Sequence, residues 1–158
     1  MMRVDFYHLQ RSTLDQALPK LAELCYAKGL RLLIRTSVSE RAEYLNGLLW
    51  TFDAGSWLPH GRQGEEFDAD QPVLITTEGG NANNATVVML TDGGTFESIR
   101  SFDRCLNLFD GRDAEAVQRA RDLWKAVVDA QCEAYYWQQN DAGHWDMKAS
   151  KVPAPPKE

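Results

Sequence analysis

The chain has 158 residues and a formal charge of −6 at pH 7, because 23 Asp and Glu outnumber 17 Lys and Arg. This length suits one domain, and a hydrophobic content of 44% is enough for a globular core and excludes a disordered chain. The apolar runs are far shorter than the ~20 residues that span a membrane, and the acidic balance disfavours a protein that coats nucleic acid through its overall charge.

Cysteine use and the first residues indicate the compartment in which the protein works. The cysteines number three and form no CxxC pair, and no apolar signal core precedes the first charged residues. We therefore expect a cytoplasmic protein whose thiols stay reduced and pack as small apolar groups.

The first half of the chain predicts strands and helices in alternation, because short apolar runs are separated by segments with apolar residues at every third or fourth position. Capping residues and turn formers mark the borders of these elements. The predicted elements are a strand at 4–9, a helix from the capping Thr13 to the stop at Gly29, a strand at 30–34 and a helix from Ser39 to about Trp50.

The middle of the chain begins with residues 51–71, whose glycines, prolines and charges predict a long ordered connection. Short apolar runs bounded by turn residues then predict further strands. The elements expected here are strands at 72–76, 86–90 and 104–109 and a short helical turn at 96–101.

The apolar spacing after Asp113 predicts the longest helix of the chain, which is expected to end near Gln139. Residues 148–158 contain three prolines and three lysines and predict a flexible tail. The remaining residues, 1–147, are interpreted as a single domain.

The order strand–helix–strand–helix, then strands, then a helix predicts an α/β fold. We expect three layers, in which helices flank a largely parallel sheet joined by right-handed crossovers. Such folds often bind nucleotides, but residues 8–13, into which the first strand leads, contain no glycine, and the Walker pattern GxxxxGK[ST] is absent. The fold is therefore expected to lack a phosphate loop.

Motifs for common catalytic and metal chemistry are absent as well. The histidines are isolated in the sequence, and neither HExxH nor a Cys/His metal spacing occurs. No GxSxG motif marks a nucleophile. We expect no catalytic residues, no metal and no cofactor.

A first group of aromatic residues, Trp50, Phe52 and Trp57, lies within eight positions in a segment rich in turn formers. One interpretation is that these side chains cover one end of the core. The other is an exposed anchor for a partner protein, since Trp is enriched at binding hot spots.

A second group lies on the predicted C-terminal helix. Arg121 and Lys125 are four residues apart and share a helix face with Trp124, and Val117 and Val128 extend the same stripe. Two cations around an aromatic ring suit an acidic, hydrophobic chain end, because the cations bind its carboxylate and the ring contacts its apolar side chain. The alternative is a solvated charged face with Trp124 in the core.

The order and spacing of several motifs resemble the chi subunit of bacterial DNA polymerase III. The resemblance covers roughly residues 1–147, and no single motif is diagnostic. The motifs are VDFYHL at 4–9, GLRLLI at 29–34, LLWTF at 48–52, SWLPH at 56–60, ARDLWK at 120–125, YWQQ at 136–139 and GHW at 143–145.

This resemblance implies a non-enzymatic α/β protein of the clamp-loader assembly that binds the psi subunit. It also implies binding of the acidic C-terminal tail of the single-stranded-DNA-binding protein, which ends in Pro-Phe. Arg121, Trp124 and Lys125 stand where the family has its tail-binding Arg, aromatic residue and Lys, while Val117 replaces a basic residue of some members. Trp50 and Trp57 match an aromatic patch implicated in binding psi or a repair helicase.

Two other functions stay open at this point. A small α/β enzyme could use Arg121 and Lys125 to anchor an anionic metabolite. Direct binding of DNA is disfavoured by the acidic charge of the chain.

Overall fold

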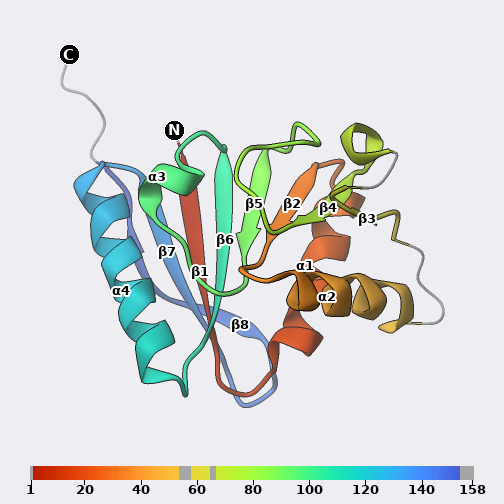
Figure 1. Cartoon of the computed structure of the whole chain (residues 1–158). Coiled ribbons are helices and arrows are strands. Elements are labelled where there is room, and N and C mark those ends of the chain that lie inside the picture. The colour runs from red at the N-terminus through yellow and green to blue at the C-terminus, as the bar shows by residue number, and fades with distance from the viewer. Residues whose placement is uncertain (1, 54–57, 65–66, 154–158) are drawn as a thin grey trace.

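The computed structural model describes residues 2–53, 58–64 and 67–153 of the chain. The described strands form one eight-stranded sheet in the order β3-β4-β2-β5-β6-β1-β7-β8 (Figure 1). Neighbouring strands are parallel except β7 and β8, which are antiparallel. The strands are β1 (Arg3–Leu9), β2 (Leu32–Arg35), β3 (Gly61–Arg62), β4 (Val73–Thr76), β5 (Val87–Leu90), β6 (Arg104–Asp110), β7 (Glu133–Gln139) and β8 (Trp145–Lys151).

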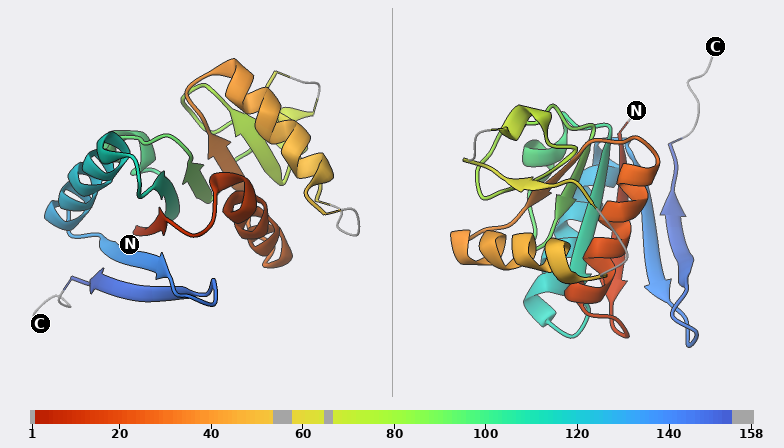
Figure 2. Two further views of the ribbon diagram at one scale, coloured as in Figure 1. Left: turned by 90° about the horizontal axis from the view of Figure 1, so that it is seen from below. Right: turned by 90° about the vertical axis from the view of Figure 1, so that its right-hand side faces the viewer.

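Helices cover both faces of this sheet. The described helices are α1 (Leu14–Ala27), α2 (Ser39–Thr51), α3 (Phe96–Ile99), α4 (Ala114–Asp129) and the 3₁₀ helix η1 (Asp68–Asp70). One hydrophobic core joins α1 and α2 to the first face, and a second core joins α3 and α4 to the other face (Figure 2). The predicted three-layer α/β fold with a largely parallel sheet is therefore confirmed.

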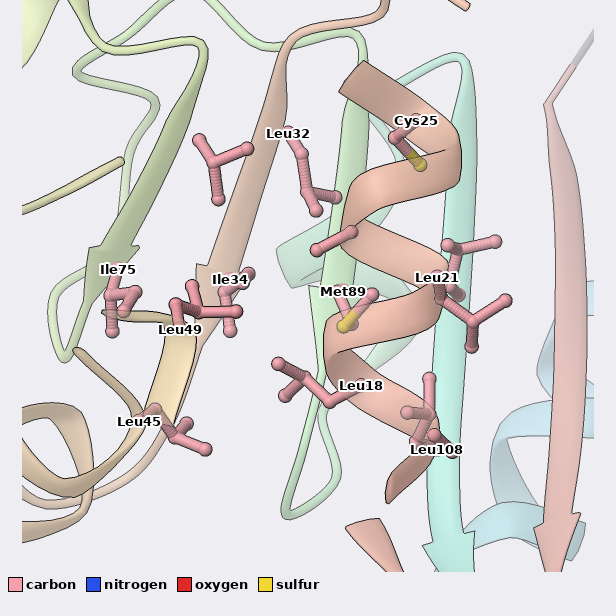
Figure 3. Packing of buried hydrophobic residues seen from close by; sticks show 14 of the residues in the cluster. Leu18, Leu21, Cys25, Leu32, Ile34, Leu45, Leu49, Ile75, Met89 and Leu108 are labelled. Carbon is pink, nitrogen blue, oxygen red and sulfur yellow. The ribbon is translucent and has the colours of Figure 1, made fainter. Parts of the chain in front are cut away.

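The core under α1 follows from the helical spacing of its apolar residues. Leu18, Leu21 and Cys25 point from α1 toward the sheet, where Met89 of β5 and Leu108 of β6 meet them (Figure 3). All of these side chains are buried. Burial of apolar surface at about 25 cal/mol per Å² makes this contact a main source of stability for the first layer.

The N-terminus of α1 is fixed by the cap that the sequence predicts. Thr13 and Gln16 form a capping box, in which the Gln16 amide donates to the Thr13 side chain and the Gln16 side chain accepts from the Thr13 amide. The helix continues through Pro19 and ends before Gly29, which adopts a φ of +74°. Helix α2 also agrees with prediction, although its N-cap is Val38 rather than Ser39.

The described residues of the predicted connection at 51–71 include two short elements. Gly61 and Arg62 form β3, which pairs in parallel with β4, and η1 follows it. The rest of the described connection is irregular and links α2 to the edge of the sheet.

The prediction of one long helix up to Gln139 is wrong. Helix α4 ends at Asp129, Gln131 adopts a left-handed φ of +59°, and residues 133–139 form β7 beside β1. The physical reason is the run Ala134–Trp137, because aromatic residues favour strands, where alternate side chains serve the two faces of a sheet. The apolar residues that seemed to extend the helix therefore belong to the sheet.

The flexible tail predicted from Lys148 also needs correction. Residues 145–151 form β8, which pairs antiparallel with β7, so that the proposed boundary at 147 falls inside a strand. Backbone pairing with β7 orders this segment despite its polar composition, and residues 154–158 lie outside the described part of the chain.

A fully buried carboxylate connects three strands on the α1 face. Asp5 of β1 accepts hydrogen bonds from Arg3 Nη2 at 2.9 Å, from Arg104 Nε of β6 at 2.8 Å and from Trp137 Nε1 of β7 at 2.9 Å. These donors satisfy a group that would otherwise be costly to bury.

Candidate functional site

A cavity of about 430 Å³ opens on the other face of the sheet, between α4 and the strands β1, β6, β7 and β8. Helix α4 contributes Val117, Ala120, Arg121 and Trp124 to this cavity, which we call the α4–β8 pocket. Its volume lies within the range of about 300–1,000 Å³ that is typical of ligand pockets.

The strands contribute the remaining lining of the pocket. Phe6 and His8 come from β1, Phe109 from β6, Tyr136 from β7 and Ala149 from β8. Most of these side chains are aromatic, and among the described residues that line the pocket Arg121 of α4 is the one that carries a full charge.

The position of α4 follows from its cap and its apolar stripe. The Asp113 side chain caps the helix by accepting a hydrogen bond from the Glu115 amide at 3.0 Å. Ala120, Leu123 and Val127 are buried against the sheet. This orientation brings the flank with Arg121 toward β7 and β8.

Trp124 forms the aromatic wall of the pocket. Its ring centroid lies 5.3 Å from that of Phe6 and 6.3 Å from that of Tyr136, in tilted and edge-on arrangements. Tilted and edge-on aromatic contacts are favourable geometries. The indole is only half-buried, which leaves part of its surface available to a ligand.

His8 forms the polar base of the pocket. Its side chain is only 8% exposed, and its Nδ1 atom contacts the hydroxyl group of Tyr136. Burial lowers the pKa of His8, and the negative charge of Asp110 opposes this effect in part. We therefore expect a neutral imidazole at pH 7.

The same burial raises the pKa of Tyr136, while a hydrogen bond with Gln138 and the charge of Arg121 lower it in part. Tyr136 thus stays a neutral hydroxyl at physiological pH.

The Nε2 atom of His8 has no hydrogen-bond partner among the described residues and lies against Gly111. A Cβ atom at Gly111 would lie only 1.8 Å from this nitrogen, so this position requires glycine.

The structure brings together three of the five residues predicted on α4. Arg121, Trp124 and Val117 line the pocket, whereas Lys125 is exposed outside its lining and Val128 is half-buried against the core of this face. In the described part of the chain, neither Arg121 nor Lys125 forms an ion pair. Their charges are therefore available to an anionic ligand.

Sequence reasoning missed the pocket residues that strands supply. Phe6 and His8 are two residues apart on β1, so the spacing of a strand predicts that their side chains lie on the same face of the sheet. The sequence pattern does not place Tyr136 and Ala149 in the pocket, because it predicts a helix and a flexible tail for their segments. Tyr136 faces the pocket because residues 133–139 form a strand and not a helix.

The first aromatic group lies at the end of α2. Trp50 is 59% exposed, and its ring centroid is 4.6 Å from that of the buried His60. The two ring nitrogens of His60 lie 2.8 Å and 3.1 Å from backbone carbonyl oxygens, which fixes the imidazole beneath the indole. Phe52 is half-buried, and Trp57 lies outside the described residues.

The described ranges lack two other kinds of site. No group of three or more His, Cys, Asp or Glu side chains there could hold a metal ion. No helix among those residues has the length and apolar character that a membrane crossing needs.

The fold is that of an α/β protein, and the α4–β8 pocket is a cavity on one face of its sheet. Residues 1–135 match the family model described as DNA polymerase III chi subunit, HolC. This chain therefore belongs to the chi-subunit family of DNA polymerase III. It is also similar to the probable DNA polymerase III subunit chi of Rickettsia prowazekii (strain Madrid E), with 33% identity over 109 residues. That alignment covers 69% of this chain and 66% of the relative, just under two thirds of its length.

Proposed function

We propose that this protein is a non-catalytic accessory subunit of DNA polymerase III that works in DNA replication. Its α4–β8 pocket would bind the acidic C-terminal tail of the single-stranded-DNA-binding protein. A second surface would bind the psi subunit of the clamp loader. Family membership supports the role in the polymerase assembly, and the chemistry of the pocket supports the choice of ligand.

The observation that carries the tail-binding proposal is the combination of Arg121 with aromatic walls in one pocket. A chain end with a bulky apolar last residue offers a carboxylate and an apolar side chain side by side. The guanidinium of Arg121 can bind the carboxylate with two N–H groups, while Trp124, Phe6 and Tyr136 contact the apolar side chain.

The first prediction concerns Arg121. Arg121→Ala is expected to weaken binding of a synthetic tail peptide about ten-fold or more, because charge-assisted hydrogen bonds contribute about 1.5–3 kcal/mol. Isothermal titration calorimetry measures this effect directly.

Arg119→Ala is the matched control for this titration. Arg119 lies two residues earlier on α4, but on the flank next to Gly93 and outside the pocket lining. The proposal predicts an unchanged affinity for this variant. Equal affinities of Arg121→Ala and the parent protein would contradict the tail-binding assignment.

The proposed surface for psi, or alternatively for a repair helicase, comprises Trp50, Phe52 and Trp57. The exposure of Trp50 supports this assignment, since a large aromatic side chain that is held in place by His60 beneath it is typical of a binding hot spot. Tethering at both surfaces would link the clamp loader to coated DNA without a direct contact between this chain and DNA. Each contact can be modest, because linked sites gain from effective concentration.

A further inference from the structure

We propose that Lys151 of β8 forms a second cationic contact for the tail, outside the α4–β8 pocket. The contact would hold the acidic residues that precede the terminal residue of the peptide. This inference rests on the proposed function of the pocket and extends it to a strand that the sequence assigned to a flexible end.

Strand pairing places Lys151 on the same face of the sheet as the pocket. Ala149, which lines the pocket, is paired with Tyr136, and Lys151 is paired with Ala134. Directly paired residues of antiparallel strands project to the same face. Ala134 is buried in the core beneath α4, so Lys151 belongs to the α4 face as well.

The chain directions place Lys151 and the exposed Lys125 at the same end of the pocket. Strands β6 and β7 are both parallel to β1, which lies between them in the sheet. Helix α4 connects β6 to β7 and therefore runs opposite to both strands. Strand β8 is also antiparallel to β7. Residues beyond Trp124 on α4 and beyond Ala149 on β8 therefore lead away from the pocket in one direction. Figures 1 and 2 show the ends of α4 and β8 at the same corner of the molecule.

The spacing fits an extended peptide. Lys151 follows Ala149 by two strand residues, a rise of about 7 Å. Each residue of an extended peptide spans about 3.3–3.6 Å, so the second and third residues before the anchored end reach the position of this lysine. The tail therefore needs no special bend to contact both Arg121 and Lys151.

Charge favours an acidic occupant at this end of the groove. Lys151 is exposed and has no ion-pair partner in the part of the chain that the structure describes. Lys125 is similarly unpaired, although Asp129 follows it one turn later on α4 and reduces the net positive charge there. Lys151 thus supplies positive charge where the helix alone supplies little.

The test compares two peptides on the full chain. One has the native acidic tail sequence, and in the other the Asp and Glu residues before the last two positions are replaced by Asn and Gln. Lys151→Gln is expected to weaken binding of the acidic peptide about two- to five-fold in low salt, and Lys151→Glu more strongly. Neither substitution should change binding of the neutralised peptide.

Lys28→Gln serves as the control, because Lys28 is an exposed lysine at the end of α1 on the opposite face. Circular dichroism of each variant verifies folding. If the parent protein binds both peptides and Lys151→Gln binds the acidic peptide equally well, the contact at Lys151 is overturned while the pocket stands. If the parent protein binds neither peptide, the proposed function and this inference are both overturned.

Discussion

At the scale of single residues, His8 links the fold to the pocket. It is held between Phe109, whose ring centroid is 5.2 Å away, and Tyr136, and it leaves no room for a side chain at Gly111. Its burial makes the charged imidazolium unfavourable, which lowers the pKa of His8. Stability should therefore depend on the protonation of this one group.

The pH dependence has a definite sign. Because the folded-state pKa of His8 lies below its ordinary value of 6.5, the unfolded chain binds the proton more readily than the folded chain. The contribution of His8 to the free energy of unfolding is complete above pH 6.5 and is lost as pH falls through the lowered pKa. Urea unfolding between pH 7.5 and 5 should show a shallower loss of stability for His8→Phe than for the parent protein.

His144→Gln is the control for this experiment, because His144 is exposed in the turn between β7 and β8. Its pH profile should follow that of the parent protein. A profile for His8→Phe that is just as steep as the parent profile would show that His8 does not titrate with unfolding.

At the scale of secondary-structure elements, the sequence was informative wherever apolar spacing and caps agreed. Thr13 and Asp113 begin α1 and α4 as predicted, and the short apolar runs became the buried strands β2, β4 and β5. The error came after Asp129, because the spacing of Cys132 and the aromatic residues is compatible with either a helix or a strand. The left-handed backbone of Gln131 separates α4 from β7. The sequence does not reveal this conformation, because the residue that adopts it is not glycine.

The same reasoning explains why the site was predicted only in part. Residues on α4 could be grouped by helical spacing, so Val117, Arg121 and Trp124 were found together. Sequence spacing within one element cannot show which strand lies opposite a helix. Phe109 and Tyr136 can be assigned to the lining of the pocket only when the order of the strands in the sheet is known. Lys125 was grouped with Arg121 because they are four residues apart, but the pocket lining ends before it.

Gln131 gives a prediction at this scale. A residue other than glycine in the left-handed region is strained by about 1–2 kcal/mol, so Gln131→Gly should raise the free energy of unfolding by about 0.5–1 kcal/mol. Gln118→Gly, in the middle of α4, should instead lower it by about 1 kcal/mol. Urea denaturation measures both changes, and a loss of stability for Gln131→Gly would contradict this account of the helix end.

At the scale of the whole molecule, the two candidate binding surfaces lie on opposite faces of one sheet. Trp50 belongs to α2 on the first face, and the α4–β8 pocket lies on the second face (Figure 2). The sheet separates the two surfaces, and we expect them to bind independently, because distant sites without shared contacts usually contribute additively. The net charge of −6 agrees with the proposed function, in which another protein makes the contact with DNA.

This arrangement predicts that the two partners bind independently. Trp50→Ala should weaken capture of purified psi at least ten-fold and leave the affinity for the tail peptide within about two-fold of the parent value. Tyr44→Ala, which removes another exposed aromatic side chain of α2, is the control. Retention of psi by Trp50→Ala would place the psi contact elsewhere on the molecule.

The buried Asp5 has a consequence for the pocket on the opposite face. Its hydrogen bond with Trp137 forms only when β7 is aligned with β1 so that Tyr135 lies beside Asp5. A slip of β7 by one residue would exchange its two faces, leaving Asp5 without one donor and turning Tyr136 away from His8. The hydrogen bond between Trp137 and Asp5 is therefore compatible only with the register that also places Tyr136 in the α4–β8 pocket.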